Sequence, residues 1–376
     1  MKKRKTKSNK KSTSVNNFKR VFSKWCGLVF FWLPKNRWLR IPIITILLAI
    51  GLFITGSYAI AQWYIYGNRN EPIRYGVTFI PEYAESLGVE PKATMQAIID
   101  ELGVRNFRLV SYWDQIEATP GIYDFSKLDW QFKKAEASDS KISLAIGLRQ
   151  PRWPECHEPT WAKGKPVFDF YPQLTNYMTA VINRYKNNPA LESYQLENEF
   201  FLSVFGECTD FTRSRLVDEY NLVKKLDPHH QIIISRSNNI IGVPVNEPIP
   251  DISAVSVYKR VWDKDYTHRY VEYPFPAWFY ATLAGTGKII NGKDLVIHEL
   301  QSEPWLPRGY DMRTAPISEQ NKSLSPARLT SRMEYGRATG IKYIDVWGVE
   351  WMYARKINFN QPDVWDTLKT QLKIQN

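Results

Sequence analysis

Two glutamates in this sequence stand where short apolar runs end. Glu199 follows the run Leu191–Leu196, and Glu299 closes the run Leu295–Glu299. A pair of carboxyl groups can cleave a glycosidic bond, because one protonates the leaving oxygen while the other attacks the anomeric carbon. When the anomeric configuration is retained, the two carboxyl groups stand about 5–5.5 Å apart. The two glutamates are therefore candidates for this chemistry, provided that the fold brings them together.

Further polar and aromatic residues follow apolar runs in the same way. Glu303 and Glu350 compete with Glu299 for the role of nucleophile, although Glu350 is better suited to binding sugar hydroxyls or to a salt bridge. Indole rings stack on sugar faces, and the tryptophans expected to do so are Trp113, Trp153, Trp305, Trp347 and Trp351.

The elements that must position these residues are predicted by the apolar pattern. From Arg74 onward, short apolar runs alternate with longer amphipathic runs, which is typical of parallel strands with crossover helices. The predicted strands are Tyr75–Ile80, Val104–Val110, Ile142–Leu148, Leu191–Leu196, Gln231–Ser235, Ile252–Val257, Leu295–Glu299 and Tyr343–Trp347. Helices are expected at Pro91–Leu102, Leu128–Ser138, Gln173–Tyr185, Thr212–Leu226, Phe275–Leu283, Pro326–Thr339 and Val364–Leu372. A helix after the fifth strand is doubtful.

Eight such units over about 300 residues predict an α/β fold of the (β/α)8 TIM-barrel type. An open doubly wound sheet is the alternative, but no GxGxxG follows the first predicted strand. In a TIM barrel the active site is built where the strands end at their carboxyl side. The candidate residues should therefore gather at one rim.

The strand-end residues resemble those of clan A, the superfamily of retaining (β/α)8 glycosidases that includes cellulases, mannanases and β-galactosidases. The most specific part is the pair Asn198-Glu199 after the fourth predicted strand, with Glu299 at the seventh. The resemblance implies that Glu199 is the acid/base, that Glu299 is the nucleophile and that Asn198 contacts the sugar 2-hydroxyl. One departure is Phe200, where many members carry proline, so the subfamily and the substrate stay open.

Three more positions carry the same resemblance. The segment 104–125 is similar to the second-strand region of these enzymes, where an arginine, here Arg108, supports the nucleophile. Tyr258 matches a tyrosine found beside the nucleophile, and Trp347 matches the tryptophan that forms the floor of the sugar subsite.

The positive charge of the chain is confined to one end. The formal net charge is +12, but residues 1–40 hold 13 of the 50 Lys and Arg residues and no Asp or Glu. The remaining residues carry 37 basic groups against 38 acidic ones and are nearly neutral. A nucleic-acid partner is therefore not expected, and the basic tail is suited to contact with anionic lipid.

An uncharged stretch, Ile41–Ala61, follows this tail. As a helix it would span about 30 Å, which is the thickness of a bilayer core. We expect a basic cytoplasmic tail (residues 1–40), a transmembrane helix (41–64), a linker (65–73) and a catalytic domain (74–376). Because positive charge favours the cytoplasmic side, the protein should be a single-pass cell-membrane protein with an extracytoplasmic catalytic domain. A cleaved signal peptide is the alternative, but its apolar core would be shorter.

The cysteine pattern indicates no metal site. Cys156 and Cys208 follow neighbouring predicted strands on the expected outer side, where they either form a disulfide or stay free thiols. No Cys/His cluster has the spacing of metal ligands, and neither a metal nor a cofactor is implied.

The sequence thus predicts a membrane-anchored retaining glycoside hydrolase that cleaves a β-linked glycan. Two rivals remain: a catalytically inactive barrel that binds carbohydrate at the cell surface, and a nucleic-acid- or lipid-binding protein that uses the barrel as a scaffold. The sugar, the linkage, endo or exo action, transglycosylation and the oligomeric state are left open.

Overall fold

The computed structural model describes residues 36–238 and 242–375 and divides the chain into two units, Met1–Ser57 and Tyr58–Asn376. One long helix, α2 (Arg37–Asn68), begins in the first unit. It is long and apolar enough to cross a membrane, with a mean hydropathy of 2.2 over its most apolar window. Residues 1–35, which include most of the predicted basic tail, lie outside the described residues.

The second unit is built on a closed barrel of eight parallel strands, which confirms the predicted fold. Its strands are β1 (Arg74–Thr78), β2 (Asn106–Val110), β3 (Lys141–Ile146), β4 (Leu191–Leu196), β5 (Gln231–Arg236), β6 (Ile252–Val257), β9 (Asp294–Gln301) and β10 (Tyr343–Trp347). Around the barrel their order is β1-β10-β9-β6-β5-β4-β3-β2. Each strand overlaps its predicted range, because a strand buried on both faces reads as a short apolar run.

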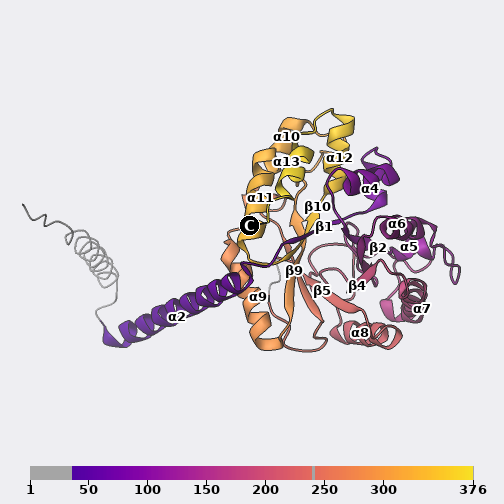
Figure 1. Ribbon diagram of the computed structural model, residues 1–376. Helices are drawn as coiled ribbons and strands as arrows, with labels where there is room; N and C mark the ends of the chain where they lie inside the picture. Colours follow the sequence, from indigo (N-terminus) through magenta and orange to yellow (C-terminus); the bar gives the residue numbers. More distant parts are fainter. Residues whose placement is uncertain (1–35, 239–241, 376) are drawn as a thin grey trace, which may run out of the picture. The chain divides into compact units, whose positions relative to one another are not determined.

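Helices surround the barrel in this unit (Figure 1). They are α3 (Pro81–Ser86), α4 (Pro91–Asp100), α5 (Trp113–Ile116), α6 (Ser126–Ala137), α7 (Val167–Tyr185), α8 (Arg213–Leu226), α9 (Ala277–Asn291), α10 (Ile317–Ser323), α11 (Pro326–Ala338), α12 (Val349–Asn358) and α13 (Asp363–Gln371). Between β5 and β6 the described residues form no helix, in line with the doubt that the sequence raised there.

A short antiparallel hairpin was not predicted. It pairs β7 (Arg260–Asp263) with β8 (Arg269–Glu272) in the long connection between β6 and α9. Its strands have four residues each and are at most half-buried, so they carry no apolar run that would mark them in the sequence.

The last turns of α2 pack against the barrel within this second unit. A Cβ atom built on Gly285 of α9 would lie 2.7 Å from Cγ2 of Ile60, so the helices meet at this glycine. The ring centroids of Tyr58 and Trp278 lie 5.7 Å apart in an edge-on contact. The chain then enters β1 at Arg74, at the amino-terminal end of the strands. This end is opposite the rim formed by the carboxyl ends of the strands, which we call the barrel mouth.

Candidate active site

Glu299 lies in β9 near its carboxyl end and is held by two donors. Nη1 of Arg108 lies 2.8 Å from its Oε1, and the Tyr258 hydroxyl donates to its Oε2 at 2.9 Å. Arg108 is fully buried and Glu299 is 4% exposed. Burying this carboxylate without partners would be costly, so the ion pair and the tyrosine stabilise its charged form.

Arg108 also fixes the end of β4. Its Nε donates to Oε1 of Gln195 at 2.5 Å, and its Nη2 donates to Oδ1 of Asn198 at 2.8 Å. Because the Asn198 oxygen faces these donors, its amide nitrogen points to the other side, where it donates to Oε2 of Glu155 at 2.9 Å. One arginine thus positions the predicted residues of two separate strands.

Glu199 lies directly after Asn198 and is 7% exposed. Its backbone has φ of 44°, and its amide donates to the Ser235 hydroxyl at 2.9 Å. Burial, and then the negative charges of Glu299 and Glu155, raise the pKa of Glu199 to about 8. Glu199 follows β4 and Glu299 lies near the end of β9, so both belong to the carboxyl-terminal rim of the barrel. Glu199 is therefore suited to keep its proton near neutral pH, while Glu299 is held by Arg108 and Tyr258.

Glu155 is a third carboxyl group at this site that the sequence analysis missed. It lies in the β3–α7 loop, is 4% exposed and stands 3.5 Å from Nη2 of Arg149. Burial raises its pKa to about 7. No strand-end pattern marks it, because its position depends on a loop in which Arg152 and Glu155 both have positive φ. The Asn198 contact brings this loop residue to the site.

Of the two alternatives for Cys156 and Cys208, the structure has the disulfide, with the two Cα atoms 5.3 Å apart. It joins the β3–α7 loop to the β4–α8 loop directly beside Glu155. The bond therefore restrains the segment that carries this carboxyl group.

A second cluster of polar residues lies around Glu303. Its two carboxylate oxygens accept from the Tyr83 hydroxyl at 2.8 Å and from Nε1 of Trp347 at 2.9 Å. The guanidinium of Arg152 pairs with Glu303 at 3.3 Å and lies over the rings of Tyr83 and Trp347, at 3.3 and 4.6 Å from their centroids. Oε1 of Glu350, which is 1% exposed, accepts from the Ile80 amide at 2.6 Å. Glu303 thus belongs to a different set of partners from Glu299.

The predicted sugar-stacking tryptophans separate into two groups. Trp153 and Trp305 are 57% and 36% exposed, and the Phe205 ring lies between them with centroids at 5.7 and 6.1 Å. Trp113 is fully buried, and its Nε1 donates to Glu117 at 2.7 Å. The expectation that Trp113 binds substrate is wrong, because its indole packs in the core behind the barrel mouth; Trp351, 1% exposed, is buried in the same way.

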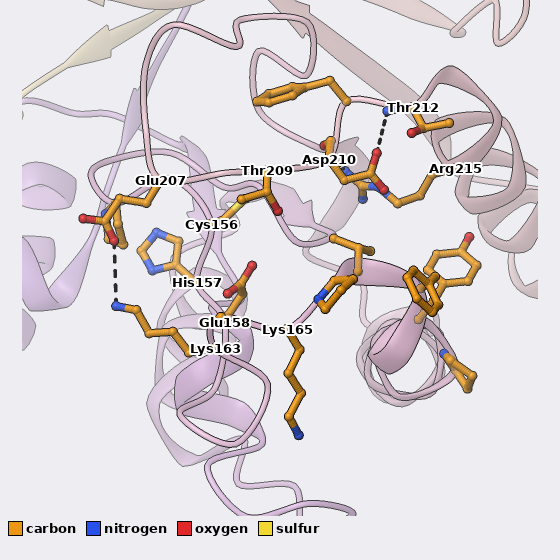
Figure 2. Close-up of a pocket in the computed structure, with 18 of the residues that line it drawn as sticks. Cys156, His157, Glu158, Lys163, Lys165, Glu207, Thr209, Asp210, Thr212 and Arg215 are labelled. Carbon is orange, nitrogen blue, oxygen red and sulfur yellow. Dashed lines mark hydrogen bonds and ion pairs between the residues drawn. The ribbon is translucent and has the colours of Figure 1, made fainter.

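A cavity of about 1260 Å³ lies beside this site (Figure 2). It is lined by Cys156, Glu158, Lys163 and Glu207 among others, and Lys163 pairs with Glu207 across it at 3.7 Å. Neither Glu199 nor Glu299 lines it. Among the described residues, no group of three His, Cys, Asp or Glu side chains could hold a metal ion.

The closed eight-stranded barrel, with its polar residues at the carboxyl ends of the strands, can be compared with solved structures. The chain shares the fold of (β/α)8 glycoside hydrolases. One example is a GH5_18 protein from Streptomyces cattleya in complex with GlcNAc, with a TM-score of 0.53, 11% identity, and coverage of 81% of this chain and 82% of that one. Another is an exo-β-1,4-mannosidase from Opitutaceae bacterium strain TAV5, with a TM-score of 0.51 and 14% identity.

The mannosidase comparison covers 73% of this chain and 51% of the mannosidase. A β-galactosidase from Halorubrum lacusprofundi gives a TM-score of 0.50 and 12% identity, with coverage of 81% of this chain and 59% of that one. The chain thus spans only about half of the length of these two larger proteins. No protein-family model matches the sequence, and no curated protein matches it either.

Proposed function

We propose that this protein is a membrane-anchored retaining glycoside hydrolase that cleaves a β-linked glycan, with Glu199 as acid/base and Glu299 as nucleophile. The observation that carries this proposal is the difference between the surroundings of the two carboxyl groups. Glu299 is paired with Arg108 and Tyr258 and so is suited to attack as an anion. The raised pKa of Glu199, about 8, keeps a proton available for the leaving group at neutral pH.

In the first step, Glu199 donates its proton to the glycosidic oxygen while Glu299 attacks the anomeric carbon. The bond from this carbon to the leaving oxygen breaks, and a glycosyl ester of Glu299 forms. The Arg108 guanidinium and the Tyr258 hydroxyl, which paired with the carboxylate, are then released to contact the ester or the sugar ring oxygen. The amide nitrogen of Asn198 donates to Glu155, and we propose that its second hydrogen donates to the sugar 2-hydroxyl, as the resemblance to clan A implies.

In the second step, Glu199 accepts a proton from water as the water attacks the anomeric carbon, and Glu299 leaves as a carboxylate. The two inversions retain the configuration. Esterified Glu299 no longer carries a charge, so one cause of the raised pKa of Glu199 disappears in the intermediate. Glu199 therefore ionises more readily when it must act as a base.

The membrane anchor is the second part of the proposal. Helix α2 would hold the barrel at the membrane, with the basic residues 1–40 in the cytoplasm and the catalytic domain from residue 74 onward outside. The disulfide supports an oxidising location for the barrel. The β-mannosidase and the β-galactosidase that share the fold support a β-linked substrate.

The roles are tested with Glu199→Ala and Glu299→Ala and an activated aryl β-glycoside in the presence of azide. Azide replaces the missing carboxylate on its own face of the sugar. We expect Glu199→Ala to give a β-glycosyl azide and Glu299→Ala to give the α-anomer, each distinguished by NMR. Glu158→Ala, a change in the neighbouring cavity, is the matched control and should keep wild-type activity.

Other results would contradict the proposal. Near-normal hydrolysis by Glu299→Ala, together with loss of activity in Glu303→Ala or Glu350→Ala, would assign the nucleophile elsewhere. A wild-type protein that binds glycans but hydrolyses none of a panel of aryl glycosides and polysaccharides would be a binding barrel.

A further inference from the structure

One ion pair divides the barrel mouth. Arg152 follows β3 and Glu303 follows β9, and these strands stand four places apart in the ring of eight. The Arg152–Glu303 pair therefore crosses the mouth. It separates the half formed by the ends of β10, β1 and β2 from the half formed by the ends of β6, β5 and β4.

The first of these halves is closed by packed side chains. Tyr83 after β1 is 9% exposed, and Trp347 at the end of β10 is 5% exposed; both donate to Glu303. Tyr112 after β2 is 5% exposed, and its hydroxyl donates to the Pro151 carbonyl at 2.7 Å. A chain of sugars could not continue through this half without displacing these contacts.

The other half is open and aromatic. Trp153 and Trp305 are exposed, and both of their rings lie next to the ring of Phe205 in the loop after β4. Val204, which precedes Phe205 in the chain, is 84% exposed. Tyr258, which contacts Glu299, is 5.6 Å from Trp305 between ring centroids. An aromatic surface thus extends outward from the carboxyl pair.

The position of the proton donor decides which half receives which part of the substrate. Glu199 follows β4 and so belongs to the open half. Because the acid must contact the leaving oxygen, the leaving group extends into the open half and the glycosyl unit lies toward the closed one.

The dividing ion pair and the closed half each have a polar atom without a partner. Nε of Arg152 and Oε2 of Glu350 are buried and have no hydrogen-bond partner among the described residues. Buried polar atoms are normally paired, so such atoms point to a ligand that supplies the missing partners. Sugar hydroxyls remote from the anomeric carbon could satisfy both, because they donate and accept.

We propose that this protein is an exo-acting β-glycosidase that removes one sugar at a time from the non-reducing end. The terminal sugar is bound against Arg152, Glu303 and Glu350, and the rest of the glycan lies on the surface formed by Trp153, Phe205 and Trp305. This inference rests on the proposed hydrolase function and adds that the enzyme acts at the non-reducing end of the glycan.

The first test is product analysis with the full-length protein in detergent. A panel of aryl β-monoglycosides identifies the sugar, and an oligosaccharide of that sugar is then labelled at its reducing end. We expect monosaccharide and labelled products that shorten by one unit at a time. From an aryl β-disaccharide, free monosaccharide should appear before the aryl group.

Early internal fragments, or direct release of the aryl group from the disaccharide, would overturn exo action but leave the proposed hydrolase function intact. Cleavage of no substrate at all would overturn both proposals.

The second test is Arg152→Ala, which removes the ion pair across the mouth. We expect kcat/KM for the aryl monoglycoside to fall about tenfold or more, because hydrogen bonds from a charged group to the sugar are lost. Arg152→Lys should recover only part of this loss, because lysine keeps the charge without the planar fork. Arg184→Ala, which breaks an exposed pair with Asp129, is the matched control and should leave kcat/KM unchanged. Unchanged kcat/KM in a folded Arg152→Ala variant would overturn the proposed role of the closed half.

Discussion

At the scale of single residues, the carboxyl group of Glu155 interacts with two of the proposed site residues. Its negative charge is one cause of the raised pKa of Glu199, after burial and the charge of Glu299. It also accepts from the amide of Asn198. Glu155 is therefore expected to be a positioning residue that helps Glu199 to keep its proton.

Glu155→Gln tests this expectation through the pH profile. Glutamine can still accept from Asn198, but it carries no charge, so the pKa of Glu199 should fall. Because Glu199 must be protonated for the first step, activity is lost as the pH rises through this pKa. The basic limb of kcat/KM for a substrate with a poor leaving group should therefore move to lower pH, by about half a unit to one unit.

The matched control is Glu158→Gln, three residues further along the same loop, where the side chain lines the neighbouring cavity. It should leave the basic limb in place. A Glu155→Gln enzyme with an unmoved basic limb would show that Glu155 has a structural role only.

The positions that could be predicted from the sequence are those at strand ends. Asn198, Glu199 and Glu299 follow from the barrel rule, because the end of a strand fixes both the place and the direction of a side chain. Arg152 and Glu155 could not be predicted, since a loop with positive φ at both residues directs them. Trp113 was assigned wrongly because a strand end does not determine whether a following indole turns to the mouth or to the core.

At the scale of elements, the β3–α7 loop depends on a covalent restraint. The disulfide joins residues 52 positions apart and holds the loop that carries Arg152 and Glu155. Cross-links of this kind typically stabilise a protein by about 2–4 kcal/mol. Removing it should affect both stability and activity.

We expect Cys208→Ser to lower the free energy of unfolding by about 2–4 kcal/mol and also to lower kcat/KM at temperatures where the barrel stays folded. Denaturant unfolding with and without a reductant, followed by fluorescence, measures the first effect. The double variant Cys156→Ser/Cys208→Ser should match the single one, because the same bond is lost. A wild-type unfolding midpoint that does not respond to complete reduction would contradict this prediction.

The strands and most helices could be predicted because periodic apolar patterns report burial directly. The β7–β8 hairpin could not, since its half-buried residues have no such pattern. The ion pair between Arg152 and Glu303 could not be predicted either, because it joins loops that follow strands on opposite sides of the barrel.

At the scale of the whole molecule, the division of charge between the tail and the body was readable from the sequence, and so was the apolar helix between them. What the sequence did not show is that the end of this helix packs on α9. Gly285 and Gly287 both lie in α9, two residues apart, yet only Gly285 meets the last turns of α2. These two glycines offer a direct test of the contact.

Alanine normally stabilises a helix relative to glycine by about 1 kcal/mol. At Gly287 an added Cβ would find its nearest atom at 3.7 Å, so Gly287→Ala should raise the melting temperature slightly. At Gly285 the added Cβ would lie 2.7 Å from Cγ2 of Ile60 and 3.2 Å from its carbonyl oxygen, so α2 must move away. Gly285→Ala should therefore lower the melting temperature and speed tryptic cleavage at Arg69 in detergent, while kcat/KM stays at the wild-type value because the mouth is at the other end of the barrel. Equal stabilisation by both substitutions would mean that the last turns of α2 do not rest on α9.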